Sequence, residues 1–201
     1  MGIHEDARQG TLVGDTLTRY LKNNPDILNE QDPATGRAPL ATAAVAGFAD
    51  VVDQLLKKGA KADALSRNGE TALLLTTRET SRNRPRIVQL LLSKTPAGSV
   101  DATTTADSNN TPLMHAVLRK DVESIKLLVK AGASRTVTNN TGLTAMAAAA
   151  SDKAVARALD PEKEQSALAK LVDQVDNFPF YIITRFNKTA DNVMDRLFEV
   201  G

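Results

Sequence analysis

The stretch GRAPLATAAVAGF at residues 36–48, followed by VVDQLLKKGA at 51–60, decides the fold of this chain because it recurs. A second copy reads TPLMHAV at 111–117 and IKLLVKAGA at 125–133. Each copy holds a Pro-Leu pair followed by small or apolar residues, then a Leu-Leu pair and a closing Gly-Ala. Self-similarity of this kind predicts a repeat architecture, in which each copy is one structural unit.

Each copy is expected to form two short helices joined by a turn. Proline favours the first turn of a helix, because its missing N–H would be unpaired there, so Pro39 and Pro112 mark where the first helix begins. Ala43 and Ala44 are small enough to let neighbouring copies approach closely. The Val and Leu positions of the second helix recur on one face, which predicts that this face is buried against the next copy.

This pattern resembles the ankyrin repeat. The resemblance covers about residues 3–160, with weaker copies beginning at Gly69 and Gly142 near the expected period of roughly 33 residues. It implies an all-α ankyrin-repeat solenoid of about five repeats, of which the terminal ones are degenerate. In the first repeat, Asp6 replaces a small residue, and the second helix is expected over Leu12 to Leu21.

The composition restricts the possible functions. With 42% apolar residues, 24% charged residues and a net charge of +1, the chain has no overall attraction for nucleic acid or an anionic membrane, and we expect neither as a partner. It has no cysteine and two histidines, which gives no support to a metal site, a cofactor or catalysis. The resemblance implies a structural hydrogen bond for His4. Without a signal peptide, we expect a cytoplasmic or nuclear protein.

The resemblance implies that the chain is not an enzyme and recognises another protein through a rigid concave surface, made by hairpin-like fingers and the first helices of successive repeats. We call this surface the concave wall. Charge reversals at Arg67, Glu70 and Arg119 are expected to weaken binding while changing stability by no more than about 0.5 kcal/mol. Counting from the Thr-Pro-Leu positions, the wall comprises Arg37, Val45, Arg67, Asn68, Glu70, Arg78, Glu79, Asp107, Ser108, Asn110, Leu118, Arg119, Asn140, Thr141 and Leu143.

A basic segment from Arg78 to Arg86 lies in the third repeat, where about three extra residues separate the two helices. Arg82, Arg84 and Arg86 follow one another at every second position. The functional interpretation is a clamp that binds an acidic or phosphorylated segment of the partner, since guanidinium groups suit both ligands. The alternative is a solvated loop that binds nothing.

The pattern changes after Asp160, so we predict a repeat domain at 1–160 and a helical C-terminal extension at 161–201. Five of the seven aromatic residues lie in this extension. It either caps the apolar face of the last repeat, which is our prediction, or binds a partner. An alternative function follows from the same segment: an enzyme or accessory subunit with a small-molecule pocket between the last repeat and the aromatic extension.

Overall fold

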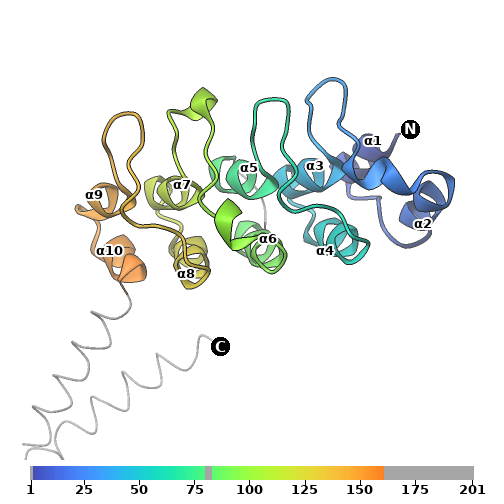
Figure 1. The fold of residues 1–201 in the computed structure, drawn as a ribbon. Coiled ribbons are helices and arrows are strands. Elements are labelled where there is room, and N and C mark those ends of the chain that lie inside the picture. The colour runs from blue at the N-terminus through green and yellow to red at the C-terminus, as the bar shows by residue number, and fades with distance from the viewer. Residues whose placement is uncertain (1, 80–82, 161–201) are drawn as a thin grey trace, which may run out of the picture. The chain divides into compact units, whose positions relative to one another are not determined.

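The computed structural model describes residues 2–79 and 83–160, which contain ten α-helices and no β-strand (Figure 1). The helices form five consecutive pairs, and the predicted all-α solenoid of five repeats is confirmed. The pairs are α1 (Ile3–Gln9) and α2 (Gly14–Asn23), α3 (Pro39–Ala46) and α4 (Ala49–Lys57), α5 (Ala72–Arg78) and α6 (Arg84–Leu92), α7 (Pro112–Leu118) and α8 (Val122–Lys130), α9 (Ala145–Ala149) and α10 (Lys153–Leu159).

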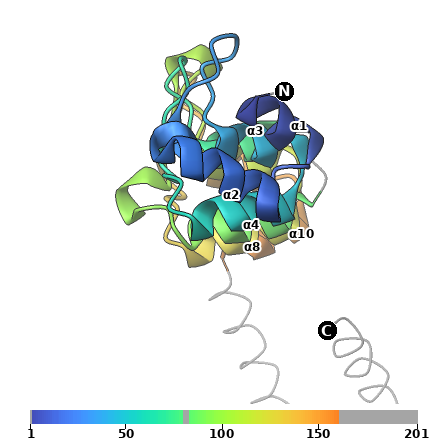
Figure 2. The same ribbon diagram turned by 90° about the vertical axis from the view of Figure 1, so that its right-hand side faces the viewer.

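The helices are arranged in two rows. The first helices α1, α3, α5, α7 and α9 each pack against the next, as do the second helices α4, α6, α8 and α10. The loops that join one repeat to the next project beside the first helices and away from the second helices (Figure 2). We number these loops as the fingers: the first at 30–38, the second at 58–71, the third at 93–111 and the fourth at 131–144.

A threonine fixes where three of the first helices begin. The Oγ1 atoms of Thr71, Thr111 and Thr144 accept hydrogen bonds from the backbone N–H three residues later, at 3.2, 3.2 and 3.0 Å. These bonds satisfy donors that have no partner inside the helix. Pro39 and Pro112 occupy the first turn, as predicted.

The core runs along the stack between the two rows. Ala43 and Ala44 are fully buried where α3 meets its neighbours, and Leu55 is fully buried on the second helix of the same repeat. Equivalent apolar positions in later repeats, such as Ile87 and Ile125, are also fully buried. Because the apolar faces of a repeat are buried against the neighbouring repeats, the stack is the unit of stability.

The first repeat has a polar contact where a small residue was expected. Asp6 is 6% exposed, and its carboxylate accepts hydrogen bonds from the Tyr20 hydroxyl at 2.7 Å and the Thr11 hydroxyl at 3.1 Å. The second helix begins at Gly14, two residues later than predicted, and Leu12 is buried in the segment before it.

Two further short helices of the 3-10 type lie in the third finger, η2 (Ala97–Ser99) and η3 (Thr105–Asp107), and η1 (Pro25–Asn29) precedes the first finger. The chain divides into two units between Leu159 and Asp160. The predicted C-terminal extension at 161–201 lies outside the described residues, as do both interpretations of it and the small-molecule pocket of the alternative function.

Candidate partner-binding surface

The structure places the predicted wall residues on the fingers and on or just after the first helices, and it places Arg84 and Arg86 of the basic segment on α6. The exposures of these predicted partner-binding residues differ widely. Arg82 falls outside the described residues. Glu70 is buried at 3% exposure. The exposed members are Arg67, Asn68, Arg86, Ser108, Leu118, Arg119, Asn140 and Thr141. The half-buried members are Arg37, Val45, Arg78, Glu79, Arg84, Asp107, Asn110 and Leu143.

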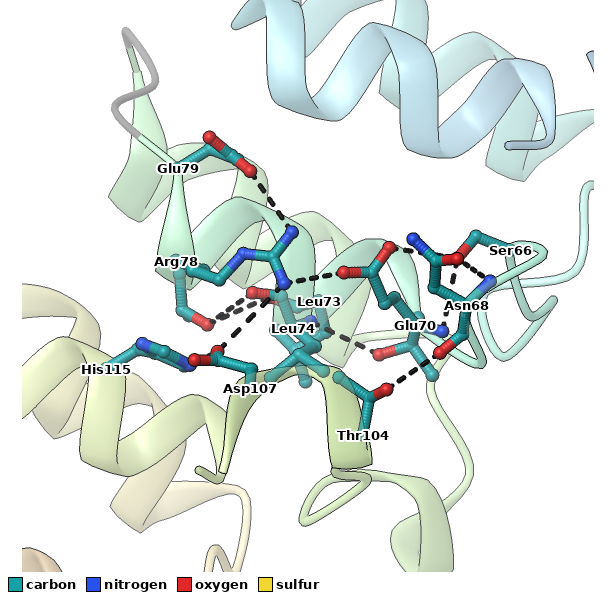
Figure 3. A network of polar contacts seen from close by, with 12 residues as sticks. Ser66, Asn68, Glu70, Leu73, Leu74, Arg78, Glu79, Thr104, Asp107 and His115 are labelled. Atoms are coloured by element: carbon teal, nitrogen blue, oxygen red, sulfur yellow. Dashed lines mark hydrogen bonds and ion pairs between the residues drawn. The ribbon is translucent and has the colours of Figure 1, made fainter. Parts of the chain in front are cut away.

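Glu70 is a structural residue of the second finger (Figure 3). Its carboxylate accepts hydrogen bonds from the Ser66 hydroxyl at 3.0 Å and from the Arg78 guanidinium at 2.5 Å. The premise that Glu70 is free to change is therefore wrong, and we expect charge reversal to lower stability, because it would bury a positive charge beside Arg78.

Arg78, the last residue of α5, connects the second and third fingers. Its guanidinium also donates to Glu79 at 3.2 Å and lies 4.0 Å from the carboxylate of Asp107 in η3. Burial alone would lower the pKa of Arg78, but its bonds to Glu70 and Glu79 raise it above the ordinary value. These contacts keep the guanidinium charged and compensate the buried carboxylate.

His115 of α7 extends this cluster into the fourth repeat. Its Nε2 atom lies 2.5 Å from the Asp107 carboxylate, and only 9% of its side chain is exposed. Burial lowers the pKa of His115, against the attraction of Asp107, and the nearby Arg78 and Arg119 lower it further. The imidazole is therefore neutral at pH 7. Sequence reasoning missed this contact, although the same eight-residue separation joins Glu70 to Arg78 and Asp107 to His115.

Neighbouring fingers are joined by side-chain hydrogen bonds. Thr104 donates to the backbone carbonyl of Asn68 at 2.7 Å, which joins the third finger to the second. Asn109 donates to Asn140 at 2.7 Å, and Asn139 donates to the predicted wall residue Asn110 at 2.8 Å. Some predicted wall residues thus hold the fingers in place, which orders the exposed residues around them.

The basic segment is less accessible than its sequence suggested. Arg84 begins α6 with 14% of its side chain exposed and pairs with Asp121 at 3.1 Å. It also donates to the backbone carbonyls of Thr76 and Glu79 at 3.2 and 3.0 Å. Burial raises the pKa of Asp121, but its bonds to Ser124 and Arg84 bring it below the ordinary value. Arg84 is thus occupied within the chain, whereas Arg86 is exposed.

An open groove of about 650 Å³ lies between α1, α3 and the first finger. His4, Arg37 and Val45 are among its lining residues. Both ring nitrogens of His4 are buried without a hydrogen-bond partner, so the structural hydrogen bond predicted for His4 is absent from the described structure. Burial lowers the pKa of His4, and the opposing attraction of Asp32 and Glu30 does not restore it.

Comparison with known proteins identifies the repeats. The family model described as "Ankyrin repeats (3 copies)" matches residues 3–103 and 80–167, which is most of the chain. The chain belongs to the ankyrin repeat family. It is similar to "Ankyrin repeat and KH domain-containing protein mask-1" of Caenorhabditis elegans, with 32% identity over 99 residues. That match covers 49% of this chain and 4% of the relative's length.

Ankyrin repeats are protein–protein interaction modules, and the family is generally non-enzymatic. Within 2–79 and 83–160, no group of three or more His, Cys, Asp or Glu side chains could hold a metal ion. None of the helices in the same part of the chain combines the length and apolarity that a membrane crossing requires.

Proposed function

We propose that this chain is a non-catalytic binding module that recognises another protein through its concave wall. The observation that carries the proposal is the set of hydrogen bonds between neighbouring fingers, at Thr104, Asn109 and Asn139. They order the surface before a partner arrives, and a pre-ordered surface loses less conformational entropy on binding.

The accessible part of the wall combines polar groups with one large apolar side chain. Leu118, at the end of α7, is 55% exposed. Ser108 and Asn140 are exposed on the third and fourth fingers, and Arg119 follows Leu118 directly. Interfaces combine an apolar centre with a polar rim, and Leu118 is the wall residue that could supply apolar area to a partner. We leave Glu70, Arg78 and Arg84 out of the proposed surface, because each is bonded to an oppositely charged side chain within the protein.

Affinity capture with matched variants tests this proposal. Leu118→Glu places a charge on the wall, and Lys126→Glu makes a charge change at an exposed position of α8 in the row of second helices. Proteins captured by the wild type and by Lys126→Glu, but lost with Leu118→Glu, would support the wall. Capture that survives Leu118→Glu and is lost with Lys126→Glu would instead place the interface on the second helices.

A further inference from the structure

The groove beside α1 contains one charged group that has no bonded partner among the residues that the structure describes. Four charged side chains line it: Glu5, Arg8, Asp32 and Arg37. Glu5 pairs with Arg8. Asp32 accepts hydrogen bonds from the backbone N–H of Ala34 at 3.1 Å and the hydroxyl of Thr35 at 2.8 Å. Across 2–79 and 83–160, the Arg37 guanidinium makes no hydrogen bond or ion pair.

The backbone holds Arg37 in position. Its carbonyl accepts a hydrogen bond from Asp32 N–H at 2.9 Å, and Gly36 N–H donates to the Asp32 carbonyl at 2.7 Å. Gly36 has a φ of +67°, and a Cβ atom there would lie 2.3 Å from Cβ of Arg67 on the second finger. This close approach requires glycine and packs the first two fingers together. The base of Arg37 is therefore rigid, while its guanidinium is available.

A second guanidinium, that of Arg67, lies in the adjacent finger, outside the residues that line the groove. Arg67 donates to the backbone carbonyl of Pro33 at 2.7 Å, so its hydrogen bond is made to a neutral group. No carboxylate pairs with Arg67 in the part of the chain that the structure describes. The floor of the groove includes the half-buried apolar side chains of Val45 and Ala46.

We propose that this groove binds an acidic segment of a partner protein, with an Asp or Glu carboxylate on Arg37 and a small apolar side chain against Val45 and Ala46. The inference deepens the proposed function and rests on it. A guanidinium binds a carboxylate through two parallel hydrogen bonds, and Arg37 has both edges available. The carboxylates of Glu5 and Asp32 in the lining disfavour a doubly charged phosphate more than a singly charged carboxylate.

Selection from a displayed library of random short peptides tests the groove. We expect peptides retained by the wild type to be enriched in Asp or Glu next to a small apolar residue. A selected peptide is then synthesised with a label, and its acidic residue is replaced by Asn or Gln. This replacement should weaken binding by about ten- to a hundredfold, the range of a charge-assisted hydrogen bond. Arg37→Glu should weaken the acidic peptide as strongly, and Lys126→Glu should leave it unchanged.

The same peptides allow a sharper test of the contact. In the Arg37→Glu protein, the acid-to-amide change in the peptide should no longer weaken binding, because the group that recognised the acid is gone. The chain has two histidines, so their proton resonances report separately on the groove, through His4, and on the third and fourth repeats, through His115. A carboxylate bound in the groove should raise the pKa of His4 and leave that of His115 unchanged.

The inference would be overturned if the selected peptides were not enriched in acidic residues, or were enriched in Lys or Arg, which would indicate Asp32 as the contact. It would also be overturned if the peptides bound Arg37→Glu as tightly as the wild type, or if they left the pKa of His4 unchanged. Failure here can be separated from failure of the proposed function. If capture of natural partners depends on Leu118 but peptide binding does not depend on Arg37, the proposed function is supported and only the groove is refuted. If capture does not depend on Leu118 and peptide binding does not depend on Arg37, both the proposed function and the groove are refuted.

Discussion

Two regions of the molecule use arginine in opposite ways: the junction between the third and fourth repeats, where the arginine is paired with carboxylates, and the groove beside the first repeat, where it is not. At the junction, Arg78 is bonded to Glu70 and Glu79 and lies near Asp107. In the groove, Arg37 lies in the first finger just before α3 and has no bonded carboxylate among the residues that the structure describes. Both arginines are half-buried.

The difference teaches that the charged residues of a repeat surface divide into two kinds. A buried carboxylate such as Glu70 requires a compensating partner, so the arginine that supplies it is part of the fold. An arginine whose neighbours are already satisfied, such as Arg37, is available for a ligand. Stability measurements should separate the two kinds, because only the first should lower the free energy of unfolding when removed.

The largest effect is expected from Arg78→Ala. Removing the guanidinium leaves the carboxylate of Glu70, 3% exposed, without its charged partner, which should lower the free energy of unfolding by about 3 to 5 kcal/mol. Urea denaturation would measure the loss. The double variant Arg78→Ala with Glu70→Gln should recover part of it, because a neutral amide replaces the orphaned charge. A loss below about 1 kcal/mol would show that the junction does not depend on this pair.

Two arginines of one helical turn provide the next comparison. Arg84→Ala removes a guanidinium that bonds to Asp121 and to two backbone carbonyls, so a loss of about 2 to 3 kcal/mol is expected. Arg86→Ala, two residues along α6, removes an exposed side chain and should change stability by less than about 0.5 kcal/mol. Thermal denaturation of the pair measures both. Equal losses would mean that burial does not distinguish the two arginines.

The two histidines predict a smaller dependence of stability on pH. Both have a pKa below the ordinary value of 6.5, chiefly through burial, so the unfolded chain binds protons more readily than the folded chain. Their contribution is complete above 6.5 and is lost as the pH falls through that value toward the lowered pKa values. The slope cannot exceed about 1.4 kcal/mol per pH unit for each histidine.

Denaturation at a series of pH values would measure this slope. His115→Gln and His4→Gln should each reduce this slope, because each variant removes one of the two titrating imidazoles. Stability that stays constant across this range in the wild type would contradict the burial of two neutral imidazoles.

The smallest effect on stability is expected where the effect on binding should be large. Arg37→Ala removes a side chain without a bonded partner in the described structure, so the free energy of unfolding should change by no more than about 0.5 kcal/mol. Calorimetry of Arg37→Ala and Arg78→Ala under the same conditions compares their free energies of unfolding directly. A loss above about 1 kcal/mol would place Arg37 with Arg78 as part of the fold, and the contrast between the two regions would disappear.

The sequence by itself determined the repeats. Pro39 and Pro112 and the stripe of Val and Leu act over a few residues, so their pattern predicts the helix pairs and the stacking of one repeat on the next. The position of Asp6 could be identified as irregular but not explained, because its partner Tyr20 is 14 residues away. The start of α2 was misplaced by two residues for a similar reason. Leu12 is buried by tertiary packing although it lies before the helix, and an apolar residue in the sequence does not show whether it is buried inside or outside a helix.

Only the tertiary structure decided which polar residues are available. Glu70, Arg78, Arg84 and Arg37 look alike in the sequence, as charged residues near fingers and helix ends. Their accessibility depends on partners in other elements, such as the 37-residue separation of Arg84 and Asp121. A local pattern cannot specify such a contact, because the contact forms only when two repeats stack and water is excluded between them. Within 2–79 and 83–160, the imidazole of His4 has no hydrogen bond and the guanidinium of Arg37 has no carboxylate partner.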